Sequence, residues 1–426
     1  MLHAFLQRLI KVGRLTVRLP DGKVEAYGDG TGPDVAVAIT GEAARRIALN
    51  PKLAFGEAYM DGGLALERGD IWDIMDVVGR NQALRPPKRK GPAGRLLRDV
   101  RLRLQQFNDR NASRANVHHH YDLSYDLYRR FLDTDMQYSC AYFARPDMTL
   151  EEAQVAKKAH LAAKLRLKPG MKVLDIGCGW GGLGLTLAKD YGVQVHGVTL
   201  SQEQLAVAQR RAREMGLEDR AKFTLTDFRD VKGPYDRIVS VGMFEHVGAP
   251  NFENYFEAVR DLLTDDGVAV IHSIGRRGPP TVTNAWMAKY IFPGGYIPSL
   301  SETLAAVEQT RMWVADVEVL RLHYAETLKA WRLRFTADRA AIAKLYDERF
   351  CRMWEFYLAS AEMAFRFSGQ MVFQLQLTKS VDALPITRDW IVDAERAGPS
   401  APKASAAKPR PSKTRSAAAP KRSTRH

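Results

Sequence analysis

The stretch VLDIGCGWGG at residues 173–182 decides the fold. It reads as a short apolar strand that leads directly into a glycine turn, and the helical sequence LGLTLAKDYG follows it. Gly177, Gly179 and Gly181 allow a tight turn and a close approach of the backbone to a ligand. Because the first turn of a helix offers unpaired N–H groups, this segment predicts a ligand site at a strand-to-helix junction.

The surrounding sequence repeats this alternation of strand and helix. Amphipathic helical stretches, such as SQEQLAVAQRRAREMG, separate four apolar runs of strand length at 172–176, 194–198, 237–241 and 268–271. This order is typical of βαβ units and predicts an α/β domain with a Rossmann-like, mainly parallel sheet. The runs VEVLRLHY (317–324) and MVFQLQLT (371–378) are expected to close that sheet as an antiparallel pair.

Composition divides the chain into four regions. Residues 1–84 combine helical spacing near the start with the alternating runs LTVRL and VAVAI, so we expect a small α+β domain there. Residues 85–110 begin with RPPKRKGPAG and are expected to form a basic linker. Residues 111–390 hold the α/β domain, and residues 391–426 lack the apolar side chains that a folded tail would need.

The overall composition excludes several protein classes. The chain has 426 residues, of which 46% are hydrophobic and 26% charged, as in ordinary globular proteins. It contains no apolar run long enough to span a bilayer, and Arg8 and Lys11 interrupt any signal-like segment at its start. The sequence therefore predicts a cytoplasmic protein. The three cysteines fit neither a zinc site nor a disulfide framework, so no metal is expected.

The net charge of +14 is concentrated in two segments. Residues 85–103 hold eight basic side chains and one acid, and residues 398–426 hold eight basic side chains and none. The rest of the chain is close to neutral, so these segments are the candidates for contact with an anionic membrane or a nucleic acid. RLLRDVRLRLQQF, within the linker, also predicts a helix that is either solvated or bound to a membrane surface.

The glycine turn has three interpretations. A purely structural turn is one, and an NAD site is another, but the NAD fingerprint places an acid about 20 residues after its glycines. Here Asp175 precedes the glycines, and this D-x-G-x-G-x-G order resembles motif I of class I methyltransferases that use S-adenosylmethionine. The end of the second strand, GVTLS, lacks the carboxylate that this class usually offers to the ribose. Thr199 and Gln204 would take that role.

Five further segments carry a more specific resemblance. In chain order they are HHHYDLSYDLYRRFLDTDMQYSCAYF (118–143), GVTLSQEQ (197–204), DRIVSVGMFEHVG (236–248), IHSIGR (271–276) and KYIFPGGYIPS (289–299). Together they closely resemble the cyclopropane-fatty-acyl-phospholipid synthases and the related mycolic acid cyclopropane synthases. FGEAYMDG (55–62) resembles the N-terminal domain of the bacterial branch that acts on phospholipids.

The resemblance implies a reaction and a base. In this family the methyl carbon of S-adenosylmethionine is added to a cis double bond of a phospholipid acyl chain, and a bound bicarbonate removes a proton from the resulting carbocation so that the ring closes. By resemblance, the bicarbonate cradle maps onto Cys140, Glu245, His272, Ile274 and Tyr324. His272 and Tyr324 would donate hydrogen bonds to the anion, as would backbone groups of Cys140 and Ile274, and Glu245 would accept its O–H.

Each of these residues also has a structural interpretation. Taken singly, His272 could be a satisfied core histidine, Glu245 a helix-capping partner and Cys140 a small buried hydrophobe. The histidines at 118–120 could form a metal tract, but the family motif needs only the last of them. An aromatic run would line an acyl channel by the same resemblance: Trp286, Tyr290, Phe292 and Tyr296.

The resemblance also implies the contacts of the cofactor. Tyr138 and Ser139 would meet its methionine end, and Phe228 would lie beside the adenine. The full set of expected cofactor residues is His120, Tyr121, Tyr138, Ser139, Asp175, Gly177, Cys178, Gly179, Gly181, Thr199, Leu200, Gln204 and Phe228.

The implied function is the cyclopropanation of unsaturated phospholipids at the inner face of the cell membrane, with which the protein would associate peripherally. A methyltransferase of the same family that makes methylene- or methyl-branched chains remains an alternative. Two more distant alternatives are a nucleic-acid methyltransferase and a non-catalytic membrane-binding protein. The strand end VGMFEHVG lacks the D/N-P-P-Y tetrad of base N-methylation, so nucleic acid is not expected as a partner. The sequence leaves open whether the protein is a homodimer.

Overall fold

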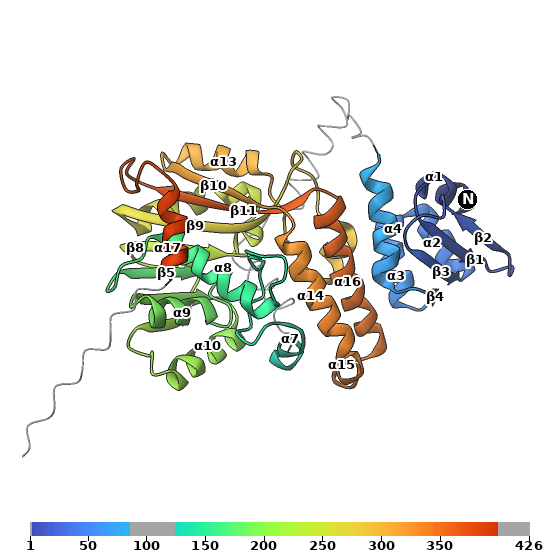
Figure 1. The fold of residues 1–426 in the computed structure, drawn as a ribbon, viewed down its shortest axis with the longest axis horizontal. Helices are drawn as coiled ribbons and strands as arrows, with labels where there is room; N and C mark the ends of the chain where they lie inside the picture. The colour runs from blue at the N-terminus through green and yellow to red at the C-terminus, as the bar shows by residue number, and fades with distance from the viewer. Residues whose placement is uncertain (1, 86–123, 399–426) are drawn as a thin grey trace, which may run out of the picture.

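The computed structural model describes residues 2–85 and 124–398 (Figure 1). The predicted linker helix, the histidines at 118–120, and Tyr121 lie outside the described residues, as does the basic tail from residue 399. In the described part of the chain, no helix is long and apolar enough to cross a membrane.

The N-terminal part is a small α+β domain, as predicted. Its sheet has the order β2-β1-β3-β4, in which β1 and β3 are parallel and the other neighbours antiparallel. The strands are β1 (Arg14–Arg18), β2 (Val24–Tyr27), β3 (Asp34–Ile39) and β4 (Leu64–Arg68), and the helices are α1 (Leu2–Leu9), α2 (Gly41–Leu49), α3 (Pro51–Met60) and α4 (Ile71–Ala83).

The second part is built on a seven-stranded sheet of order β10-β11-β9-β8-β5-β6-β7 (Figure 1). The strands are β5 (Lys172–Ile176), β6 (Gln194–Thr199), β7 (Ala221–Leu225), β8 (Tyr235–Val241), β9 (Leu263–Arg276), β10 (Trp313–Leu320) and β11 (Gln370–Thr378). Strands β5 to β9 pair in parallel, and β11 pairs antiparallel with both β9 and β10. The predicted fold class is therefore confirmed.

Helices cover both faces of this sheet because its buried strands are apolar on both sides. Along β5, Val173 packs in one core cluster and Leu174 in another, as the two-residue period of a strand requires. One face is covered by α8 (Leu150–Leu165), α9 (Gly182–Asp190) and α10 (Gln202–Glu214), and the other by α11 (Phe252–Leu262) and α13 (Leu300–Gln309). The remaining helices are α7 (Tyr125–Phe131), α12 (Ala285–Tyr290), α14 (His323–Ala337), α15 (Arg339–Leu345), α16 (Glu348–Phe367) and α17 (Asp389–Ala397).

Two predicted boundaries were wrong. The strand predicted at 317–324 ends at Leu320, because the chain turns there and a helix with buried Leu328 and Trp331 begins at His323. The predicted end of the folded domain at residue 390 falls inside α17, which Ile391 anchors by its burial. The Glu395 carboxylate of α17 also contacts the ring of His160 on α8.

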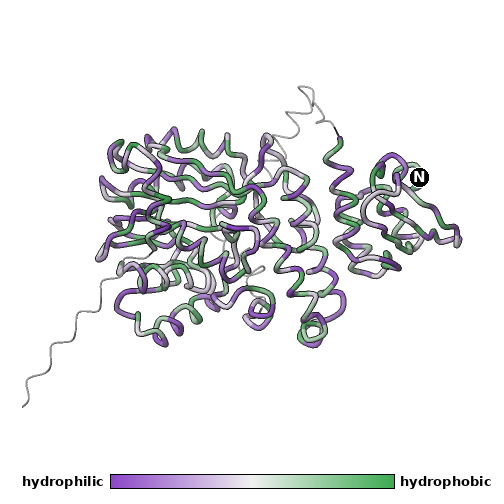
Figure 2. The backbone as a smooth tube through the Cα atoms, in the orientation of Figure 1, coloured by the Kyte–Doolittle hydropathy of each residue, from purple (hydrophilic) through white to green (hydrophobic). Residues whose placement is uncertain are grey.

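The two parts dock through close contacts between α3 and α4 on one side and α12 and α16 on the other (Figure 1). A Cβ added at Gly56 would lie 2.5 Å from Trp286 Nε1, so only glycine fits this contact. Tyr59 donates its hydroxyl proton to Glu355 over 3.1 Å. The hydropathy colouring shows apolar segments on the facing helices (Figure 2).

Candidate active site

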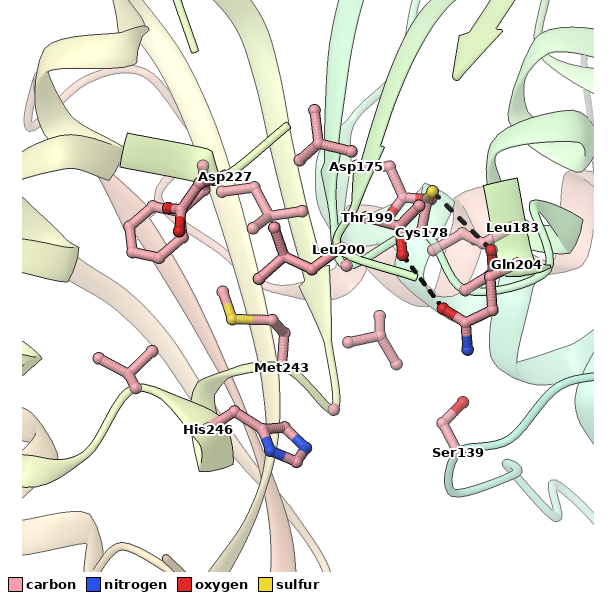
Figure 3. A pocket seen from close by; sticks show the side chains of 18 of the residues that line it. Ser139, Asp175, Cys178, Leu183, Thr199, Leu200, Gln204, Asp227, Met243 and His246 are labelled. Atoms are coloured by element: carbon pink, nitrogen blue, oxygen red, sulfur yellow. Dashed lines mark hydrogen bonds between the residues drawn. The ribbon is translucent and has the colours of Figure 1, made fainter. Parts of the chain in front are cut away.

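A cavity of about 220 Å³ opens at the carboxyl ends of β5, β6 and β8, the edge at which such sheets bind ligands (Figure 3). Ten of the thirteen expected cofactor residues line it: Tyr138, Ser139, Asp175, Gly177, Cys178, Gly179, Thr199, Leu200, Gln204 and Phe228. His120 and Tyr121 lie outside the described residues. The structure thus brings together residues from four separate sequence segments.

The three glycines of the turn have different roles. Gly177 and Gly179 both line the cavity at positive φ, 81° and 53°. A Cβ at Gly179 would meet no protein atom within 4 Å, so the space beside it is open. Gly181 does not line the cavity; a Cβ there would lie 2.8 Å from the Cβ of Ala208. Its small size allows α9 to pack against α10.

Asp175 presents an unsatisfied carboxylate to this cavity. Its Oδ2 is buried and has no hydrogen-bond partner among the described residues. Burial raises the pKa of Asp175 to about 7, and the nearby Lys157 ammonium opposes the rise. A buried carboxylate with an unused oxygen is suited to a cationic ligand.

The second-strand end supplies hydroxyl and amide groups, as the sequence indicated. Thr199 donates its Oγ1–H to Gln204 Oε1 over 3.1 Å, and Ser201 N donates to Thr199 Oγ1 over 3.1 Å. Sequence reasoning missed Asp227, which lines the same cavity and is fixed by Arg229 through bonds of 2.8 and 2.6 Å. Its position two residues after β7 was the available signal, because carboxyl ends of parallel strands share one edge.

Lys157 on α8 is a second residue that sequence reasoning missed. It is fully buried, and its ammonium donates to Gln137 Oε1 over 2.6 Å and to Ser139 Oγ over 2.8 Å. Burial lowers the pKa of Lys157 to about 8, while Asp133 works against that shift. Because Gln137 and Ser139 line the cavity, Lys157 fixes that wall. The sequence does hold a sign of this burial: Lys157 follows Ala153, a buried residue, by four positions and so lies on the same face of the helix.

Glu245 lies next to the cavity, in the turn after β8. Its Oε1 accepts the backbone N–H of Ile274 over 2.6 Å, and its Oε2 is buried without a partner in the described ranges. Burial raises the pKa of Glu245 to about 7. The backbone N–H of Ile274, predicted to donate to a bound anion, donates to Glu245 in this structure. His246, the next residue, lines the cavity.

His272 is held across the sheet by a residue that the sequence did not indicate. Gln374 on β11 lies opposite His272 in the register, and its Nε2 is 3.1 Å from His272 Nδ1. Burial lowers the pKa of His272 well below its usual value, so the ring is neutral. Because Nδ1 is engaged by the Gln374 amide, Nε2 is the ring nitrogen left to contact another partner.

Cys140 and Tyr324, the other two residues of the predicted cradle, come from two further segments. Burial raises the pKa of Cys140, so it remains a thiol, and its Sγ donates to Ala141 O over 3.3 Å. The Tyr324 ring packs against Phe365 with 4.8 Å between centroids. Both residues belong to the core cluster against which Ile274 packs. The backbone N–H of Ala141, next to Cys140, donates to Thr327 Oγ1 over 3.0 Å, so this segment lies against α14, the helix that carries Tyr324.

The predicted aromatic channel does not coincide with this cavity. Trp286 and Tyr290 lie in the contact with the N-terminal domain, where Tyr290 donates its hydroxyl to Glu57 over 2.9 Å. Tyr296 donates to Glu302 over 2.9 Å, and Phe292 packs against Tyr357. Within residues 2–85 and 124–398 no cluster of metal-binding side chains occurs, and the three cysteines are buried and free.

Comparison with protein families gives two matches. Residues 108–375 match a family described as mycolic acid cyclopropane synthetase, and residues 1–85 match a family described as a domain of unknown function. The cyclopropane-fatty-acyl-phospholipid synthase of Escherichia coli K12 is 40% identical over 342 residues, which are 79% of this chain and 86% of that protein.

Two further relatives bear on the site. The tuberculostearic acid methyltransferase UfaA1 of Mycobacterium tuberculosis is 34% identical over 398 residues, 88% of this chain and 91% of that protein. The crystal structure of mycolic acid cyclopropane synthase CmaA1 complexed with SAH and CTAB superimposes with a TM-score of 0.59 at 35% identity. That match covers 62% of this chain and 97% of that one.

Proposed function

Because the chain belongs to the mycolic acid cyclopropane synthetase family, we propose that it converts cis-unsaturated acyl chains of phospholipids to cyclopropane chains with S-adenosylmethionine as the methyl donor. The similarity to the E. coli phospholipid synthase over 79% of the chain supports the substrate. The observation that carries the proposal is a buried, half-satisfied carboxylate, Glu245, beside a cavity built by the glycine turn.

S-adenosylmethionine fits the cavity chemically. Its sulfonium and ammonium charges suit the unpartnered Oδ2 of Asp175, and Gly179 leaves open space for close approach. The hydroxyl of Thr199 and the amide of Gln204 offer polar contacts for a ribose, and the Phe228 ring offers a face for an aromatic base. The SAH complex of the relative CmaA1 supports this choice of ligand.

The chemistry of the residues proposed for the cradle suits bicarbonate. The Oε2 of Glu245 is buried and unpartnered in the described part of the chain, and it could accept an O–H of the anion. We propose that the neutral His272 carries its proton on Nε2 and donates it to the anion, and that the Tyr324 hydroxyl is a further donor. When bound, S-adenosylmethionine supplies the methyl carbon and bicarbonate supplies the base that removes a proton.

The residues of the chain orient the partners and protect a cation. The carbocation on the acyl chain must survive until deprotonation, so nucleophiles near it have to be unreactive. The neutral His272 has its Nδ1 engaged by Gln374, and the Cys140 sulfur is held as a thiol. Burial keeps water from the cradle: Cys140, His272 and Tyr324 are all buried.

The substrate requires contact with a membrane surface, so we propose that the protein acts as a peripheral protein on phospholipid bilayers. A branching methyltransferase is the second candidate, because the relative UfaA1 is named a tuberculostearic acid methyltransferase. Both reactions begin with the same methyl transfer and differ in which proton leaves the cation. We propose the reaction that closes the ring, because the E. coli relative is named a cyclopropane-fatty-acyl-phospholipid synthase.

The affinity for S-adenosylmethionine is expected to rise with pH through about 7. Asp175 has a raised pKa of about 7 and is protonated below it, and a cationic ligand binds the ionised form more tightly. Asp175→Asn should flatten this dependence and lower the affinity at pH 8. Calorimetric titrations between pH 6 and pH 8 measure the affinity of each protein for S-adenosylmethionine. Asp219→Asn is the control, because Asp219 is exposed. If the affinity of Asp175→Asn depended on pH as that of the wild type does, Asp175 would not be a residue of the cofactor site.

A direct assay tests the proposed substrate. The purified protein is incubated with methyl-labelled S-adenosylmethionine and with vesicles of cis-unsaturated phospholipid, vesicles of saturated phospholipid, or total RNA. Label is expected in the unsaturated lipid alone, because only that acyl chain offers an alkene. Label in RNA, or equal label in saturated lipid, would contradict the proposed function.

A further inference from the structure

A second cavity lies at the same edge of the large sheet, toward β10 and β11. Its volume is about 710 Å³, and it is formed where β9 and β10 end, where β11 begins, and where α16 ends. Four arginines line it, Arg276, Arg277, Arg321 and Arg366, and no acidic residue does within the described ranges. The cavity therefore carries a concentrated positive charge.

Two of these arginines are free to bind a ligand. Arg277 and Arg321 are exposed, and neither side chain forms an ion pair with another described residue. The other two are already engaged. Arg366 bonds to Glu326 and Glu362, each over 2.9 Å, and Arg276 donates to Ile297 O over 2.8 Å. Arg277 and Arg321 are thus the two guanidinium groups of this cavity that are exposed and have no ion pair or side-chain hydrogen bond in the described ranges, so all their donors are available to an anion.

The walls of this cavity are apolar next to the arginines. Val319, Leu322 and Phe365 line it together with the four arginines. Apolar side chains continue along the outer face of β10, an edge strand, where Trp313 is 53% exposed and Val319 38%. A cationic rim beside exposed apolar groups is complementary to a lipid that has a phosphate and acyl chains.

The cavity also adjoins the proposed reaction centre. Phe365 lines it and packs against the Tyr324 ring with 4.8 Å between centroids. Arg276 follows Ile274 by two residues on β9, a distance of about 7 Å along an extended strand. Phe365 therefore separates this cavity from Tyr324, a residue of the proposed cradle.

We propose that Arg277 and Arg321 bind the phosphodiester of a glycerophospholipid in this cavity. The phosphate is held at the rim by two guanidinium groups, and the glycerol and first carbons of the acyl chains contact Val319, Leu322 and Phe365. The identification of that lipid as the substrate rests on the proposed function. Binding of the lipid itself does not.

The experiment compares two double variants of the full chain. Arg277→Gln with Arg321→Gln removes the two free guanidinium groups, and Arg213→Gln with Arg220→Gln removes two exposed arginines on α10 and just before β7. Calorimetry measures the binding of a short-chain phosphatidylglycerol, below its micelle concentration, and of inorganic phosphate. Methyl transfer to long-chain phosphatidylglycerol and to a diacylglycerol with the same chains is measured in neutral mixed micelles.

Wild type and the control variant are expected to bind the short-chain phospholipid, and Arg277→Gln/Arg321→Gln should bind it at least about 30-fold more weakly, because two charge-assisted contacts are lost. The KM for phosphatidylglycerol should rise in that variant, with unchanged kcat and unchanged transfer to diacylglycerol. A wild type that does not bind the phospholipid, equal binding in both variants, or phosphate binding as tight as lipid binding would overturn the inference. Normal lipid binding with no methyl transfer in any protein would instead refute the proposed function alone.

Discussion

Glu245→Gln is expected to lower turnover at least about 1,000-fold and to leave the affinity for S-adenosylmethionine within about twofold of the wild type. The substitution keeps the size of the side chain, and the amide oxygen can still accept the N–H of Ile274. The amide nitrogen, however, cannot accept the O–H that the buried Oε2 is proposed to receive. The base would then be misplaced after methyl transfer begins.

Turnover and ligand affinity must be measured separately to test this expectation. His272→Ala should give the same pattern, and removal of bicarbonate from the buffer should slow the wild type. Glu218→Gln is the matched control, because Glu218 is exposed and neither it nor its neighbours line the cavity. A parallel loss of affinity and turnover in Glu245→Gln would assign Glu245 to the cofactor site instead of the cradle.

Gly179→Val is expected to weaken the binding of S-adenosylmethionine about 100-fold or more, because the branched side chain would occupy the space that the ligand needs. A Cβ at Gly179 would meet no protein atom within 4 Å, and this open space belongs to the cavity. The fold itself has room for the side chain, although a φ of 53° disfavours valine. Binding should therefore fall much more than stability.

A second glycine separates these two effects. Gly216 has a φ of 63° and also has no atom near its added Cβ, but it lies after α10 and outside the cavity. Gly216→Val should share the backbone strain and keep normal affinity. Calorimetry and thermal unfolding of both variants give the comparison. Normal affinity in a folded Gly179→Val protein would show that the cofactor binds elsewhere.

The sequence was sufficient to predict the strands and turns that build the cofactor site. The strand at 172–176 and the turn at Gly177 and Gly179 occur where the apolar run and the glycines placed them. This was predictable because period and turn chemistry are local properties. Residues at successive strand ends, such as Asp175 and Thr199, then meet by the geometry of parallel sheets.

Contacts between distant segments could not be read in the same way. Gln374 meets His272 only because β11 pairs with β9 in one particular register. A shift of one residue would have turned the amide to the other face. Lys157 resembles any lysine of an amphipathic helix until α8 buries it beside Ser139. The docking of Gly56 against Trp286 likewise depends on how the two parts of the chain pack.

The central claim is that the enzyme makes a ring from an alkene and one methyl carbon. The most direct measurement is the structure of the product formed from purified protein, S-adenosylmethionine and a cis-monounsaturated phospholipid, by mass spectrometry and proton NMR. We predict a mass gain of one methylene group, the loss of both olefinic proton signals and the appearance of cyclopropane methylene signals. The same mass gain with a methyl- or methylene-branched chain, or an unchanged lipid, would contradict the claim.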